Sequence, residues 1–131
     1  MRFARIVFTI AGIWGIVVLT PFYWLVDVTG RQYPAPAEYL QFFYGFFSVA
    51  LVWQIAFLVI GTNPQRFRPL MIPSLLEKLG FVATLAVLYG RGGISAEDAA
   101  PAVPDLLLGV LFLVAFMKTR VQARAPQPDR E

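Results

Sequence analysis

Two adjacent charged residues, Glu77 and Lys78, lie inside a long apolar segment of this chain. A charge within a membrane span is energetically costly and normally finds a partner or water, so it is a candidate for ligand binding or proton transfer. Counting back from Tyr89 at about 1.5 Å per residue places Glu77 about 18 Å below the outer boundary. In a hydrocarbon core of about 30 Å, that position is about 10 Å inside the inner face.

A structural interpretation of the two charges is the one we favour. Both side chains would reach back to the cytoplasmic interface, with Glu77 completing a capping box that begins at Ser74. Neighbouring positions on a helix do not face one another, so no pairing of Glu77 with Lys78 is predicted.

The chain contains no Cys and no His. Disulfides, thiol redox chemistry and sites that need Cys or His ligands, such as haem or iron–sulfur centres, are therefore excluded. The remaining residues offer no nucleophile–base pair. We predict no catalytic residue, no metal and no cofactor, and hence no enzymatic activity.

Further polar and small residues recur along the apolar segments. Gln41, Gln54 and Asp105 are candidates for ligand binding or for polar contacts inside the membrane, and Gln54 stands on a different face from Gln41. Small residues at helical spacing let membrane helices approach closely. We predict helix packing for them, with the border of a cavity as the alternative. These small residues are Gly12, Gly45, Ser48, Gly80, Thr84 and Gly109.

Composition and hydropathy predict a membrane protein. Hydrophobic residues make up 58% of the 131 residues and charged residues 15%, against about 25% charged in soluble domains. Four apolar stretches, approximately residues 6–26, 39–60, 70–90 and 104–119, match the length of about 20 residues that crosses a bilayer. The third helix begins at either Pro69 or Ser74. We predict a single all-α domain, a four-helix bundle in the membrane, followed by a basic cytoplasmic tail over residues 120–131.

The distribution of Lys and Arg predicts the orientation. The outer side holds only Arg31 and Arg91, and Lys78 lies within the third segment. Short loops rich in basic residues stay in the cytoplasm, so both ends of the chain are predicted to be cytoplasmic. The inner side holds the other eight basic residues: Arg2, Arg5, Arg66, Arg68, Lys118, Arg120, Arg124 and Arg130. The acids predicted to lie outside are Asp27, Glu38, Glu97, Asp98 and Asp105.

Aromatic residues gather at the predicted outer boundary, as in an interfacial belt. The belt consists of Phe22, Tyr23, Trp24, Tyr33, Tyr39 and Tyr89. A second run of aromatics covers most of the circumference of the second helix, so part of it must face lipid, a ligand or another protein. At the inner side, Arg66 and Arg68 are candidates for binding a lipid headgroup or an acidic partner, although their role in topology requires neither.

The turn Asn63-Pro64-x-Arg66-x-Arg68-Pro69 joins spans two and three, and the last span opens with Asp105 and ends in a basic tail. This plan resembles the small four-span proteins of the DoxX-like superfamily and related uncharacterised families. The resemblance covers most of the chain and implies the same four-helix plan. It carries over no catalytic constellation, and the redox cysteines of some members are missing here.

Three functions are compatible with the sequence. The one we favour is a non-catalytic accessory or assembly subunit of a larger membrane complex, or a homo-oligomer, in the inner (cytoplasmic) membrane of a bacterium. Its partners would be the bilayer and other membrane subunits or copies of itself, and no nucleic acid. The alternative is a binder or converter of a hydrophobic molecule, isoprenoid or sterol-like, in a cavity near Glu77. A small oligomeric transporter is the third.

Overall fold

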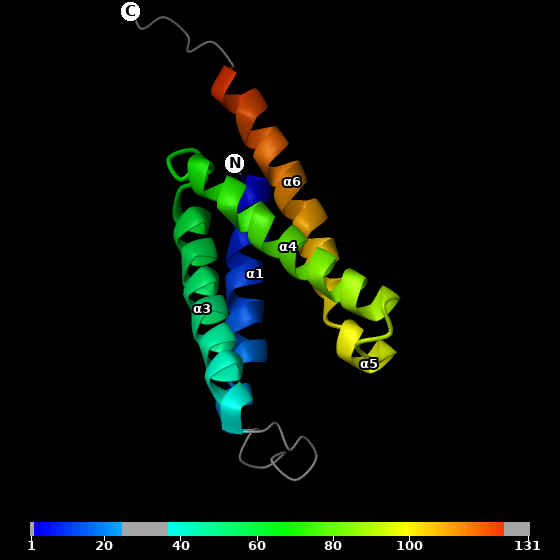
Figure 1. Ribbon diagram of the computed structural model, residues 1–131. Helices are drawn as coiled ribbons and strands as arrows, with labels where there is room; N and C mark the ends of the chain where they lie inside the picture. The colour runs from blue at the N-terminus through cyan, green and yellow to red at the C-terminus, as the bar shows by residue number, and fades with distance from the viewer. Residues whose placement is uncertain (1, 25–36, 125–131) are drawn as a thin grey trace, which may run out of the picture.

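A computed structural model describes residues 2–24 and 37–124 of the chain. Over these residues the fold is all-α (Figure 1). Its elements are α1 (Arg2–Leu19), α3 (Ala37–Thr62), the short 3₁₀ helix η1 (Arg68–Leu70), α4 (Met71–Gly90), α5 (Ala96–Ala99) and α6 (Ala102–Arg124). Four helical stretches, Arg2–Trp24, Gln41–Thr62, Arg68–Gly90 and Ala96–Thr119, are long and apolar enough to cross a membrane. The predicted fold class, an all-α bundle of four spans, is confirmed.

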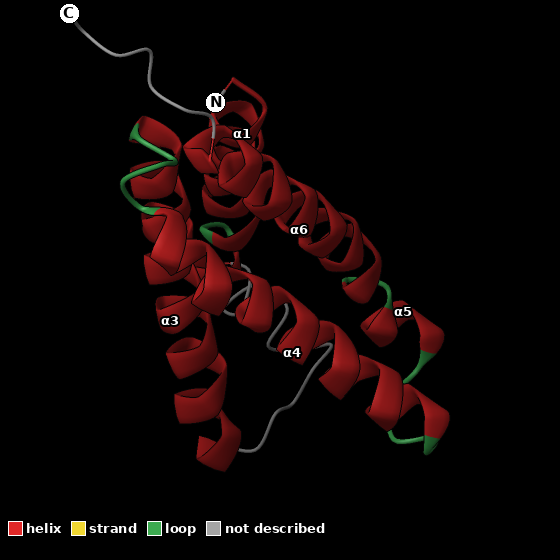
Figure 2. Cartoon of the chain, turned by 90° about the horizontal axis from the view of Figure 1, so that it is seen from above, coloured by secondary structure: helices red, strands yellow, loops and turns green. Residues whose placement is uncertain are grey.

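The helices form two pairs. α1 packs along α3, and α4 packs along α6. The pairs also meet through α1 and α6, whereas α3 and α4 make few contacts with each other. Figures 1 and 2 show the start of α3 and the short helix α5 well apart, because the two pairs diverge toward that end. The start of α1 and the end of α6 lie together at the opposite end (Figure 1).

α1 and α3 approach closely because glycine faces the partner helix. The buried positions of α1 recur every three or four residues, as a single helical face requires. On this face, a Cβ at Gly12 would lie 2.8 Å from the backbone oxygen of Gln54, and a Cβ at Gly15 would collide with the Gln54 side chain. A larger residue at Gly12 would push the backbone of α3 away, and one at Gly15 would displace the Gln54 side chain.

An aromatic core closes the end of the bundle at which α1 begins. Phe8, Phe57 and Phe112 are fully buried and come from α1, α3 and α6. The rings of Phe8 and Phe112 are stacked with centroids 4.2 Å apart, and those of Phe57 and Phe112 meet edge to face at 4.9 Å. Smaller buried residues surround these rings: Ala4, Val7, Ala11, Ile60, Met71 and Ala115. The three rings join three of the four spans, and Met71 adds the fourth, α4.

The outer faces of the helices are apolar and exposed. Val17 is 64% exposed, Val52 65% and Leu107 62%. Exposed surface of this kind along all four spans is what lipid covers, so the chain is an integral multi-pass membrane protein.

The helix of the third span begins near Pro69, the earlier of its two predicted starts, and not at Ser74. η1 leads directly into α4, which already begins at Met71. Ser74 is buried within the helix, and its hydroxyl donates a 2.7 Å hydrogen bond to the Leu70 carbonyl one turn earlier. The predicted capping box is therefore wrong, because the helix already extends to the N-terminal side of Ser74 and leaves no free amide for it to cap.

The fourth span is broken near its start. α5 is separated from α6 by Ala100 and Pro101, and the two together make up the span Ala96–Thr119. The predicted span began only at residue 104. α6 continues to Arg124, into the predicted tail, and residues 125–131 lie outside the described residues, as do the loop residues 25–36.

Candidate functional site

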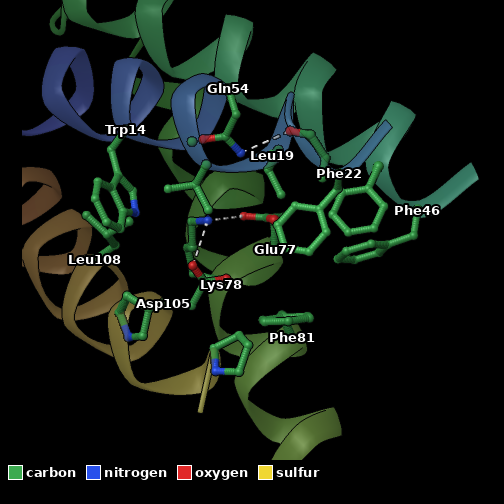
Figure 3. A pocket seen from close by; sticks show the side chains of 16 residues that line it. Trp14, Leu19, Phe22, Phe46, Gln54, Glu77, Lys78, Phe81, Asp105 and Leu108 are labelled. Atoms are coloured by element: carbon green, nitrogen blue, oxygen red, sulfur yellow. Dashed lines mark hydrogen bonds and ion pairs between the residues drawn. The ribbon is translucent and has the colours of Figure 1, made fainter. Parts of the chain in front are cut away.

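Charged side chains from two spans meet inside the bundle. The Lys78 ammonium of α4 donates a 3.2 Å hydrogen bond to Asp105 Oδ1 of α6. Lys78 Nζ also lies 3.4 Å from Glu77 Oε2. Figure 3 shows the ammonium between the two carboxylates. We call Glu77, Lys78 and Asp105 the charged cluster.

Lys78 does not reach back to the cytoplasmic interface. Only 4% of the residue is exposed, and its ammonium lies 5.3 Å from the centre of the Phe57 ring. The favoured interpretation of this residue is therefore wrong. A lysine stays inside an apolar bundle only when a partner takes up its charge, and Asp105 is that partner.

Asp105 lies deeper than its predicted position outside the membrane. Because α5 precedes α6 at the outer end of the fourth span, the first turn of α6 lies at the level of Lys78, where a Cβ at Gly109 would be 3.6 Å from Lys78 Cβ. An acid in the first turn of a helix is also favoured by the positive end of the helix dipole. The sequence named Asp105 both as a candidate for polar contacts inside the membrane and as an outer acid, and the outer position followed from a fourth span predicted to begin at residue 104.

Glu77 is the least satisfied member of the charged cluster. Its Oε2 is close enough to Lys78 to form an ion pair, contrary to the prediction for neighbours on a helix. The approach is not aligned as a hydrogen bond, so this buried oxygen has no hydrogen-bond partner among the described residues. The Glu77 side chain remains 21% exposed and that of Asp105 19%.

The charged cluster lies near the middle of the spans. Two basic side chains mark the end of the bundle at which α1 begins, which we call the basic end. The Arg68 guanidinium lies 3.9 Å from the centre of the Phe116 ring, and the Lys118 ammonium lies 4.3 Å from the centre of the Phe3 ring. Lys78 follows Arg68 by ten residues and precedes Tyr89 by eleven, or about 15 Å and 16 Å of helix. In a core of about 30 Å the charged cluster is thus close to mid-depth.

A cavity of about 270 Å³ lies beside the charged cluster. All three charged residues line it, together with Gln54 of α3 (Figure 3). The Gln54 amide donates a 2.9 Å hydrogen bond to the Ala50 carbonyl of its own helix. Aromatic side chains make up much of the remaining wall: Trp14, Phe22, Phe46, Phe47 and Phe81.

The cavity is blocked toward the basic end and accessible from the side. The core formed by Phe8, Phe57 and Phe112 fills the basic end of the bundle. On the other side, Phe22 and Phe46 are partly exposed where the helix pairs diverge, and Phe46 stacks on Phe81 across the gap between α3 and α4. Among the described residues, a small molecule would therefore reach the charged cluster from the side on which the helix pairs diverge.

The remaining polar candidates lie elsewhere. Gln41 is exposed at the far end of α3 and does not line the cavity. Arg66 and Arg68 belong to the turn at the basic end. The Arg66 amide donates to Asn63 Oδ1 (3.2 Å), and the buried Nε of Arg68 has no hydrogen-bond partner among the described residues. These two arginines are not part of the site.

The small residues have two different environments. Gly12 and Gly109 contact neighbouring helices. A Cβ at Gly45 or Gly80 would meet no atom within 4 Å. Thr84 is likewise exposed and bonds the Gly80 carbonyl of its own helix, and the hydroxyls of Ser48 and Tyr23 lie 2.7 Å apart. Within the described part of the chain, Gly45, Gly80 and Thr84 therefore do not pack against another helix.

Several wall residues carry no signal in the sequence. Phe22 was predicted to belong to the interfacial belt, yet it stacks on Phe47 with centroids 4.8 Å apart and lines the cavity. Trp14 is one of many aromatics in the spans, and its type alone does not indicate a cavity. The neighbouring Gly15 leaves space for the Gln54 side chain, and this glycine is the sequence feature that distinguishes this level of the bundle.

The charged cluster can bind a cation or hold a proton. Among the described residues, no group of three or more Asp and Glu side chains could hold a metal ion.

Comparison with known protein families, curated proteins and solved structures finds no match to this chain. The resemblance to the DoxX-like superfamily therefore stays a prediction.

Proposed function

We propose that this membrane protein binds a small, largely apolar molecule in the cavity beside the charged cluster. The observation that carries the proposal is the position of that cluster: Glu77, Lys78 and Asp105 are held at mid-span and line a cavity of about 270 Å³. Charges are costly at this depth and mark ligand or proton sites in membrane proteins.

The walls and the charged cluster have different roles in binding. A molecule that moves from lipid to an aromatic wall gains little hydrophobic free energy, because lipid tails are equally apolar. The aromatic wall therefore accepts many apolar bodies, and selectivity comes from the charged cluster. Lys78 and Asp105 take up each other's charge, so we propose binding without chemical conversion.

The location that we propose is the cytoplasmic membrane of a bacterium, with both chain ends inside. Arg68 and Lys118 lie at the end of the bundle where α1 begins. This grouping supports the positive-inside orientation.

Binding can be tested with two fluorinated probes in lipid nanodiscs. The probes are para-fluoro-neopentylbenzene, which is neutral, and para-fluorobenzyl(trimethyl)ammonium, which has the same shape and a positive nitrogen in place of one carbon. Fluorine NMR would measure saturable binding above that of protein-free nanodiscs. We expect at least one probe to bind; saturable binding of neither would contradict the proposed function.

A pair of matched variants assigns the binding to the cavity. Ala50 is buried and lines the cavity, whereas Ala86 is exposed on α4 and does not. Ala50→Leu should fill the cavity and abolish binding, and Ala86→Leu should leave it unchanged. Equal binding by the two variants would place the probe outside the cavity.

A second candidate function is assembly with another membrane subunit or with a second copy of the chain. The observation that favours it is the open space at Gly45 and Gly80, where a Cβ would meet no atom of the described residues within 4 Å. Native mass spectrometry from nanodiscs would test it. Gly45→Leu and Gly80→Leu should weaken association and Ala86→Leu should not; a monomer in all cases would contradict self-assembly.

A further inference from the structure

We infer that the ligand of this cavity is a monovalent organic cation, an amine or quaternary ammonium on an apolar body, and that protons compete with it. This inference rests on the proposed function, because it specifies the chemical class of the molecule bound at the same site. Three features of the charged cluster and its surroundings support it.

The first feature is the balance of charge. With all three groups ionised, Glu77 and Asp105 carry two negative charges and Lys78 one positive charge. Among the described residues, the others that line the cavity carry no ionisable group. One surplus negative charge thus remains in a low-dielectric site, where it attracts a cation far more strongly than it would in water. A monovalent cation restores neutrality.

The second feature is the unfilled acceptor on Glu77. The Lys78 ammonium donates to Asp105 Oδ1 at 3.2 Å, but its approach to Glu77 Oε2 is not aligned as a hydrogen bond. A buried carboxylate oxygen without a donor costs free energy. The ammonium group of a ligand that enters beside Glu77 would supply the missing positive charge and, for an amine, the missing donor.

The third feature is the aromatic wall. The rings of Phe22, Phe46 and Phe81 lie to one side of the charged cluster and that of Trp14 to the other (Figure 3). Ring faces attract cations, and quaternary ammonium groups are bound in this way between aromatic side chains. An anion would meet both the surplus charge and the negative ring faces. A neutral molecule would leave the surplus charge unmatched.

Competition with protons follows from the same balance of charge. A proton on Glu77 neutralises the surplus charge, so the protonated site loses its attraction for a cation. Cation binding is therefore strong at high pH and weakens as the pH falls through the titration of the carboxyl group. If binding of one cation displaces one proton, the Kd of the cation rises by up to about tenfold for each unit by which the pH falls.

The probe pair measures this preference directly. We expect para-fluorobenzyl(trimethyl)ammonium to bind at least about tenfold more tightly than its neutral counterpart. The affinity for the cation should fall at low pH, and that for the neutral probe should not. Equal affinities, or an affinity for the cation that does not change with pH, would overturn the inference and leave the proposed function intact. Saturable binding of neither probe would overturn both.

The variant Glu77→Gln removes the surplus charge and keeps the shape of the side chain. We expect its affinity for the cation to fall to that for the neutral probe, and the pH dependence to disappear. Retained binding of the neutral probe shows that the variant is folded. Glu97→Gln, on the exposed helix α5, is the matched control and should behave as the native protein does. A preference for the cation that survives Glu77→Gln would contradict the role given to this carboxylate.

Discussion

Lys78 Nζ and Asp105 Oδ1 lie 3.2 Å apart, and this contact joins α4 to α6 near the middle of the membrane. The two residues are 27 positions apart in the chain. A buried ion pair of this kind contributes little net stability, because desolvation offsets the attraction. Breaking it is costly, however, since the remaining charge has no water to solvate it. The contact therefore fixes which faces of α4 and α6 meet.

Removal of the ammonium should destabilise the fold. Lys78→Met leaves Glu77 and Asp105 without a cation, and we expect the free energy of unfolding in mixed micelles to fall by about 3–5 kcal/mol. Lys118, the other lysine of the chain, is exposed at the basic end. Lys118→Met is the control; it removes only an exposed cation–π contact with Phe3 and should change stability by no more than about 1 kcal/mol.

A double-mutant cycle isolates the contribution of the pair. With Asp105→Asn as the second substitution, we expect a coupling energy with Lys78→Met of about 1–3 kcal/mol. Additive effects of the two substitutions would show that the two groups do not interact.

Gly15 and Gly45 should respond in opposite ways to the same substitution. A Cβ at Gly15 collides with the Gln54 side chain, whereas a Cβ at Gly45 meets no atom within 4 Å. We expect Gly15→Ala to lower the free energy of unfolding by about 1–3 kcal/mol. Gly45→Ala should leave it unchanged or raise it by up to about 1 kcal/mol, because alanine favours the helix. Equal effects would contradict the close packing of α1 on α3.

The orientation can be tested with cysteine labelling, because the chain has no cysteine of its own. Gln65 lies in the turn between α3 and η1, and Ala96 begins α5; both are exposed. In intact cells a membrane-impermeant maleimide should label Ala96→Cys. Gln65→Cys should be labelled only after the membrane is permeabilised. The reverse pattern would contradict the predicted cytoplasmic ends.

The four spans were predictable because they depend on local information. A run of about 20 apolar residues needs no knowledge of its neighbours to be identified as a span. The start of the third helix was harder. Ser74 and Glu77 have the spacing of a capping box, but η1 had already begun the helix on the N-terminal side of Ser74.

The partners within the site were not predictable, although Glu77, Lys78, Gln54 and Asp105 were all named as candidates. Their meeting depends on the break at Pro101. Because α5 takes the outer position, α6 and its Asp105 begin deeper in the membrane. Their meeting depends also on the angle between the helix pairs, which no local pattern encodes. The sequence motif favoured an interfacial Lys78, whereas the fold provides a buried partner 27 residues away.

Labelling with two carbodiimides distinguishes a Glu77 carboxylate that faces an apolar, lipid-accessible cavity from one that faces bulk water. Dicyclohexylcarbodiimide is a membrane-soluble carboxyl reagent, and a charged carbodiimide is its water-soluble counterpart. In nanodiscs, mass spectrometry should find the membrane-soluble reagent on Glu77 and the charged reagent on Glu97 and Asp98 of the exposed helix α5. Prior addition of the bound probe should protect Glu77. Equal labelling of Glu77 by the charged reagent, or no labelling of Glu77 by either, would contradict a lipid-accessible cavity at the charged cluster.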